Sequence, residues 1–107
     1  MNNHSSLQIA IVGTGGTGGI LGTYLSRAGH QVTFIARGAH LAALQEKGLT
    51  LHTAHRGTIH LPQVKACTMD NYHATPDIML ICVKYYSLPD AIRFVRQHAD
   101  KHTLIIP

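Results

Sequence analysis

Residues 9–18 read IAIVGTGGTG, an apolar run of strand length that leads directly into the pattern GxGxxG and then into a helix-forming segment. A turn of this kind is typical of dinucleotide binding, because it brings backbone N–H groups and the positive end of a helix dipole to one place. The pattern therefore predicts contacts with a diphosphate from Gly13, Thr14, Gly15, Gly16, Thr17 and Gly18.

The three glycines of the pattern have different predicted roles. Gly13 allows a tight turn out of the strand, Gly15 lets the backbone approach the diphosphate, and Gly18 lets the helix pack closely on the sheet. Taken alone, GxGxxG is also compatible with a glycine-rich loop that holds no ligand. The strand before it and the helix after it favour the nucleotide.

Composition restricts the class of protein. The chain has 107 residues, of which 45% are hydrophobic and 13% charged, and this suits one folded domain rather than a disordered segment. No apolar run reaches the length of a membrane span and the polar N-terminus lacks signal-peptide features, so a cytoplasmic protein is expected. The net charge of +4 comes from scattered Lys and Arg, which predicts no nucleic-acid or membrane patch.

Histidine and cysteine usage predicts no metal site. The nine histidines include His52, His55 and His60, but no HxxxH or Cys/His zinc spacing occurs. Cys67 and Cys82 are expected to be reduced and to act as small buried hydrophobic residues.

The order of the expected elements indicates an α/β fold. Strands are predicted at 7–12, 31–36, 77–83 and 103–106, helices at 17–28, 39–47 and from Ser87 to Ala99, and a hairpin from 49–54 and 58–61. Ser87 is expected to cap its helix through the hydroxyl, with Asp90 as the acidic third position. Strands alternating with helices predict a Rossmann-like, mostly parallel sheet flanked by helices, with one antiparallel hairpin.

Apolar residues recur at helical spacing in two of the predicted helices. In the first they are Ile20, Leu21, Tyr24, Leu25 and Ala28, and in the last they are Leu88, Ala91, Ile92, Val95 and Ala99.

The residue after the second predicted strand indicates which dinucleotide is bound. NAD-binding versions of this fold have an acidic residue about 20 positions after the glycines, which accepts hydrogen bonds from the ribose. Here the strand is followed by Arg37, whose guanidinium suits bidentate contact with a 2′-phosphate. The sequence thus predicts NADP; the alternative is that Arg37 is an ordinary solvated side chain.

Several segments together resemble the N-terminal domain of the ketopantoate reductase family. They are residues 13–18, Ala36-Arg37-Gly38 with His40-Leu41, Gly48-Leu49-Thr50-Leu51, and Cys82-Val83-Lys84, and the resemblance extends over essentially the whole chain. It implies NADPH-dependent reduction of 2-dehydropantoate to pantoate, a step in pantothenate and coenzyme A biosynthesis. It further implies that residues 13–18 hold the diphosphate, that Arg37 meets the 2′-phosphate, and that Lys84 lies beside the cofactor. Tyr85 departs from the family, which commonly has Ala there, and Tyr86 follows it.

The resemblance also implies a domain boundary. Residues 1–107 are expected to form the dinucleotide-binding domain, with a helical domain that carries the catalytic residues beyond Pro107. We therefore expect no catalytic residue in this chain, no reduction of ketopantoate by it alone, and contact with a 2-keto acid only in a longer protein.

Two alternative functions stay open from the sequence. The chain could be the cofactor domain of another NADP-dependent hydroxyacid dehydrogenase, or a nucleotide-sensing module without chemistry. Apolar surface left uncovered in an isolated domain can drive self-association, so a homo-oligomer is a further hypothesis.

Overall fold

A five-stranded parallel sheet forms the centre of the protein. The computed structural model describes residues 6–13 and 15–107. The strand order is β5-β2-β1-β6-β7, and every neighbouring pair is parallel. The strands are β1 (Gln8–Val12), β2 (Gln31–Ile35), β5 (Lys65–Cys67), β6 (Ile78–Ile81) and β7 (Leu104–Ile106). The chain moves outward from β1 first to one side and then to the other, which is the order of a Rossmann-like sheet.

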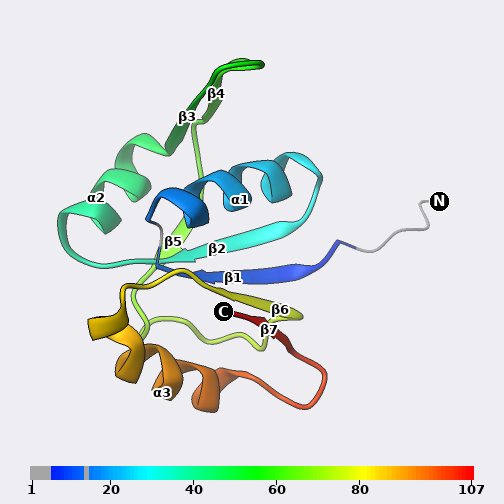
Figure 1. Ribbon diagram of the computed structural model, residues 1–107, viewed down its shortest axis with the longest axis vertical. Coiled ribbons are helices and arrows are strands. Elements are labelled where there is room, and N and C mark those ends of the chain that lie inside the picture. Colours follow the sequence, from blue (N-terminus) through cyan, green and yellow to red (C-terminus); the bar gives the residue numbers. More distant parts are fainter. Residues whose placement is uncertain (1–5, 14) are drawn as a thin grey trace.

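Helices cover both faces of this sheet. The helices α1 (Gly16–Arg27) and α2 (Gly38–Lys47) lie on one face, and α3 (Leu88–His98) lies on the other (Figure 1). A short 3₁₀ turn, η1 (Tyr85–Ser87), precedes α3. The predicted α/β architecture of a mostly parallel sheet flanked by helices is confirmed.

The central strand β1 contributes to two cores. Ile9 and Ile11 belong to the cluster that also contains Phe34 and Leu44, on the side of α1 and α2. Ala10 and Val12 belong to the second cluster, which contains Ala91 and Phe94 of α3. Because alternate residues of a strand point to opposite faces, a strand covered on both sides must be apolar throughout, as residues 9–12 are.

The predicted hairpin forms a separate two-stranded sheet. Strands β3 (Leu49–Thr53) and β4 (Gly57–Leu61) pair antiparallel, with Leu49 opposite Leu61 and Thr53 opposite Gly57. Figure 1 shows the hairpin extending away from the five-stranded sheet beyond α1 and α2. The expectation of one antiparallel element within a parallel fold is confirmed.

Helix α1 contacts the sheet through its small residues. Gly22 and Thr23 are buried, whereas Ile20 is 44% and Leu21 is 39% exposed, so part of the apolar stripe that predicted this helix lies outside the core. A Cβ atom at Gly22 would meet the ring of Phe34 and lie 2.8 Å from Cδ1 of Ile11. The helix approaches the sheet so closely that a larger residue does not fit there.

Replacement of Gly22 by alanine will destabilise the protein. Phe34 is fully buried, so its ring cannot easily yield to the new methyl group, and overpacking of this kind costs about 1–3 kcal/mol. The higher helix propensity of alanine, worth up to about 1 kcal/mol, offsets only part of that cost. Urea denaturation of the two proteins measures the difference. A Gly22→Ala variant more stable than the wild type would contradict the close contact between α1 and β2.

Three details of the predicted elements are wrong. The strand β5 was not predicted, because three residues between polar segments carry too little pattern. Ser87 makes no side-chain capping hydrogen bond; its N–H instead donates to the carbonyl of Lys84 at 2.9 Å within the 3₁₀ turn. Helix α3 buries Ala91 and Phe94, while Leu88 and Ile92 are exposed.

No helix in the described ranges has the length and apolarity to cross a membrane.

Candidate functional site

Two adjoining cavities lie around the carboxyl ends of β1, β2 and β6. The larger, of about 600 Å³, extends toward the β2–α2 connection and the start of α3, and the smaller, of about 380 Å³, extends toward the end of β7. Both are lined by Gly15, Cys82, Val83 and Lys84. The chain leaves β1 toward β2 on one side and reaches β6 on the other, so the cavities meet at the switch point where ligands bind in open α/β sheets.

The end of β1 is a turn that only glycine can make. Gly13 has a φ of +85°, and its N–H donates to the carbonyl of Ile35 at 3.0 Å. A Cβ atom at Gly13 would lie 2.7 Å from the carbonyl oxygen of Cys82, and one at Gly18 would lie 2.7 Å from the carbonyl oxygen of Gly13. The turn at Gly13 and the close packing at Gly18 thus hold the start of α1 against β1 and against the end of β6.

Gly15 differs from these two glycines, because the fold does not exclude a side chain there. It is exposed, lines both cavities, and a Cβ atom on it would meet nothing within 4 Å. It is the N-cap of α1, Gly16 begins the helix, and Thr17 is exposed and lines the smaller cavity. Thr14 lies outside the described residues.

The start of α1 is suited to an anion. Among the described residues no side chain caps the helix, and its first turn contains no acidic residue. The backbone N–H groups of a helix's first turn have no partner within the helix, and together with the dipole they favour a bound anion. The residues present therefore fit the diphosphate group of a dinucleotide.

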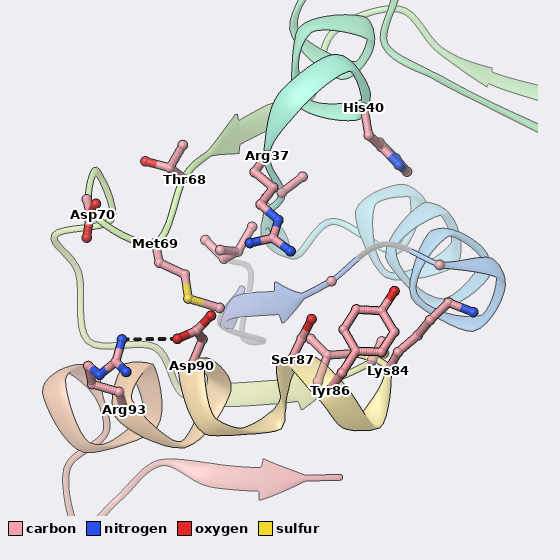
Figure 2. A pocket seen from close by; sticks show the side chains of 16 residues that line it. Arg37, His40, Thr68, Met69, Asp70, Lys84, Tyr86, Ser87, Asp90 and Arg93 are labelled. Carbon is pink, nitrogen blue, oxygen red and sulfur yellow. Dashed lines mark hydrogen bonds and ion pairs between the residues drawn. The ribbon is translucent and has the colours of Figure 1, made fainter.

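Arg37 and Lys84 bring positive charge to opposite parts of the larger cavity. Arg37 is exposed at the N-cap of α2, and Figure 2 shows its guanidinium directed into the cavity from the β2–α2 connection. Lys84 is exposed, lies three residues after the last residue of β6, and lines both cavities. The structure thus brings Arg37, Lys84, Gly13 and Gly15 to one cavity, as the predicted site requires.

Sequence reasoning missed a further wall of the larger cavity. It consists of Thr68, Met69 and Asp70, which follow β5, and of Ser87, Asp90 and Arg93 near the start of α3. Asp90 and Arg93 form an ion pair of 3.1 Å, from Nη1 of Arg93 to Oδ1 of Asp90 (Figure 2). The first group was missed because β5 was not predicted, and the second because Asp90 was considered only as a helix-start residue.

Tyr85 and Tyr86 follow Lys84 and are both exposed. Their ring centroids are 5.8 Å apart in an edge-on arrangement. Tyr86 lines the larger cavity (Figure 2), whereas Tyr85 lines neither cavity. Of this pair, Tyr86 is therefore the ring placed to cover a ligand in the larger cavity.

The two cysteines are free thiols that are partly rather than fully buried. Burial raises the pKa of the Cys82 thiol, so this group adds no negative charge to the two cavities that it lines. Within residues 6–13 and 15–107, no group of three or more His, Cys, Asp or Glu side chains could hold a metal ion.

A doubly wound sheet with a glycine turn at its switch point defines a Rossmann-like domain. The chain belongs to the ketopantoate reductase family: the family model described as Ketopantoate reductase PanE/ApbA matches residues 9–107. This result favours the ketopantoate reductase resemblance drawn from the sequence over a neighbouring dehydrogenase family.

Individual proteins that resemble this chain carry the name of the same family. A 2-dehydropantoate 2-reductase from Mesorhizobium japonicum is 31% identical over 101 residues, which are 94% of this chain and 30% of that protein. One from Pyrococcus horikoshii is 33% identical over 86 residues, covering 80% and 27%. The crystal structure of a PanE/ApbA family ketopantoate reductase from Ralstonia eutropha matches with a TM-score of 0.78 and 32% identity, covering 91% and 32%. The chain spans about a third of the length of these relatives.

Proposed function

We propose that this chain is the NADP-binding domain of a 2-dehydropantoate 2-reductase, which reduces 2-dehydropantoate to pantoate in pantothenate and coenzyme A biosynthesis. The observation that carries the proposal is the pair of cavities that meet at Gly15 and Lys84, with Arg37 in the larger one. A dinucleotide has two halves joined by a diphosphate, and the site offers two cavities that meet at the start of α1.

Each group of residues has a distinct role in this proposal. Backbone N–H groups of residues 13–18 hold the diphosphate, Lys84 supplies countercharge to it, and Arg37 binds the 2′-phosphate of the adenosine half. The nicotinamide half lies in the smaller cavity, whose apolar lining includes Leu21, Ile81, Val83 and Ile106. Such a lining offers the nicotinamide ring an apolar surface.

The bound cofactor would supply a hydride to the 2-keto carbon of the substrate, and the resulting oxygen must then receive a proton. We assign the proton donor and the residues that hold the 2-keto acid to the longer protein, in a helical domain after residue 107. The 107-residue chain alone is expected to leave NADPH oxidation at the rate without protein when 2-dehydropantoate is added.

The proposed location and partners follow from the same role. An enzyme of this pathway is expected in the cytoplasm, with NADPH and a 2-keto acid as its ligands. Strand β7 is an edge strand of the sheet, and its three residues are 40–56% exposed: Leu104, Ile105 and Ile106. In the isolated chain this apolar edge favours self-association.

Ligand-induced stabilisation tests the proposal. NADPH will raise the melting temperature of the chain, because a ligand that binds only the folded state stabilises it by mass action. At 100 times the dissociation constant the gain is about 2.7 kcal/mol. NADH at the same concentration will give a smaller shift, and 2-dehydropantoate will add none. A melting temperature that is independent of NADPH would contradict the proposal.

A Lys84→Gln variant will bind NADPH and NADH more weakly to the same degree. Lys84 lines both cavities, so its proposed contact is with the diphosphate that the two nucleotides share. The ammonium is exposed and screened by solvent, so the expected loss is at most about fivefold. Fluorescence titration with each nucleotide measures it. A loss confined to NADPH would move Lys84 to the 2′-phosphate site.

A further inference from the structure

Two carboxylates, Asp70 and Asp90, line the larger cavity at the end away from Lys84. Asp90 reaches this end from the first turn of α3, opposite Met69 of the segment after β5 (Figure 2). The proposed ligand of this cavity is a polyanionic nucleotide, and a carboxylate has the same sign of charge. A carboxylate is therefore unfavourable there unless a cation offsets its charge or a hydrogen-bond donor faces it. Asp90 has one such partner in Arg93, so the question is what its second oxygen can bind.

One oxygen of Asp90 is already occupied and the other is available. Nη1 of Arg93 donates to Oδ1 at 3.1 Å, which offsets the charge and restricts the orientation of the carboxylate. Among the described residues, Oδ2 accepts no hydrogen bond. The Asp90 side chain is about half exposed, so Oδ2 can accept a hydrogen bond from a group bound in the cavity.

The proposed function determines which part of the nucleotide reaches this end. With the diphosphate at Gly15 and Lys84 and the 2′-phosphate at Arg37, the base extends beyond Arg37 toward Met69 and Asp90. Met69 is partly buried against the core and offers a thioether to an aromatic ring. Adenine carries a donor at its 6-amino group, on the edge of the base away from the sugar.

We propose that Asp90 is the residue that selects adenine, by accepting a hydrogen bond from its 6-amino group through Oδ2. The inference rests on the proposed NADPH site and adds a specificity-determining residue to it. Arg93 acts through Asp90 as a positioning residue. The analogue of NADPH with hypoxanthine in place of adenine presents a carbonyl oxygen at position 6, and this oxygen faces the carboxylate without a donor between them.

Fluorescence titration of the full chain with NADPH and with the hypoxanthine analogue tests the proposal, because it measures both dissociation constants. The wild type will prefer NADPH by about 10-fold or more, the range expected when a charged acceptor loses its donor. In Asp90→Ala the preference will fall to about threefold or less. Asp90→Asn is nearly isosteric and its amide can donate to the carbonyl, so the preference will reverse toward the analogue.

Asp100→Asn is the control that removes the same charge outside the cavity. Asp100 is exposed in the loop before β7. Its replacement should leave the ratio of the two dissociation constants unchanged. Equal affinity of the wild type for the two nucleotides, or a ratio that Asp90→Ala and Asp90→Asn both leave unchanged, would overturn the role of Asp90 alone. Failure of the wild type to bind either nucleotide would overturn this inference together with the proposed function.

Discussion

An Arg37→Ala variant will bind NADPH roughly 10- to 150-fold more weakly than the wild type and will bind NADH with unchanged affinity. The factor corresponds to about 1.5–3 kcal/mol, the range for hydrogen bonds to charged groups. NADH lacks the 2′-phosphate, so it has no group for this guanidinium to bind. Fluorescence titration with both nucleotides measures the two affinities.

The geometry around Arg37 gives the reason for this selectivity. β2 ends at Ile35, and Arg37 is the N-cap of α2 at the wall of the larger cavity, where no acidic residue lies near it in the sequence. Arg27→Ala is the matched control, because Arg27 is an exposed arginine in the last turn of α1 and does not line the cavity. Equal losses for NADPH and NADH in Arg37→Ala would mean that Arg37 does not bind the 2′-phosphate.

A Gly13→Ala variant will lose about 2–5 kcal/mol of folding free energy, a large part of the total for a domain of this size. Two costs add. The positive φ at Gly13 costs a residue with a side chain about 1–2 kcal/mol, and the contact with the carbonyl of Cys82 costs about 1–3 kcal/mol more. Urea denaturation followed by circular dichroism measures the loss.

Gly29→Ala separates these two costs. Gly29 has a similar φ of +97°, but a Cβ atom there would meet nothing within 4 Å, and it follows the other end of α1. We expect a loss of about 1–2 kcal/mol and unchanged NADPH binding. If Gly13→Ala were no less stable than Gly29→Ala, the close approach of β1 and β6 at the glycine turn would be wrong.

The sequence was sufficient to predict the sheet and helices where pattern and local chemistry agree. The apolar run of residues 9–12 predicts a strand covered on both faces, and both of its faces are buried. The hairpin was predictable because two alternating segments flank a short connection that leads into Gly57, the first residue of β4. Arg37 was selected because the residue after the second strand of this fold lies near the adenosine ribose, and the structure places Arg37 at the wall of the larger cavity.

Features that depend on distant contacts could not be predicted. β5 forms because Lys65, Ala66 and Cys67 lie alongside β2, and three residues carry no periodicity of their own. The face of α1 that meets the sheet is set by the fit of Gly22 against Phe34, so exposed Ile20 and Leu21 gave a misleading stripe. Asp90 enters the cavity only because α3 begins beside the residues that follow β5.

A crystal structure of the chain with NADPH tests the central claim most directly. The account predicts density for the diphosphate over residues 13–18, with the 2′-phosphate against Arg37 and the nicotinamide in the cavity lined by Leu21 and Ile106. A diphosphate bound elsewhere on the molecule, or a 2′-phosphate that points away from Arg37, would contradict it.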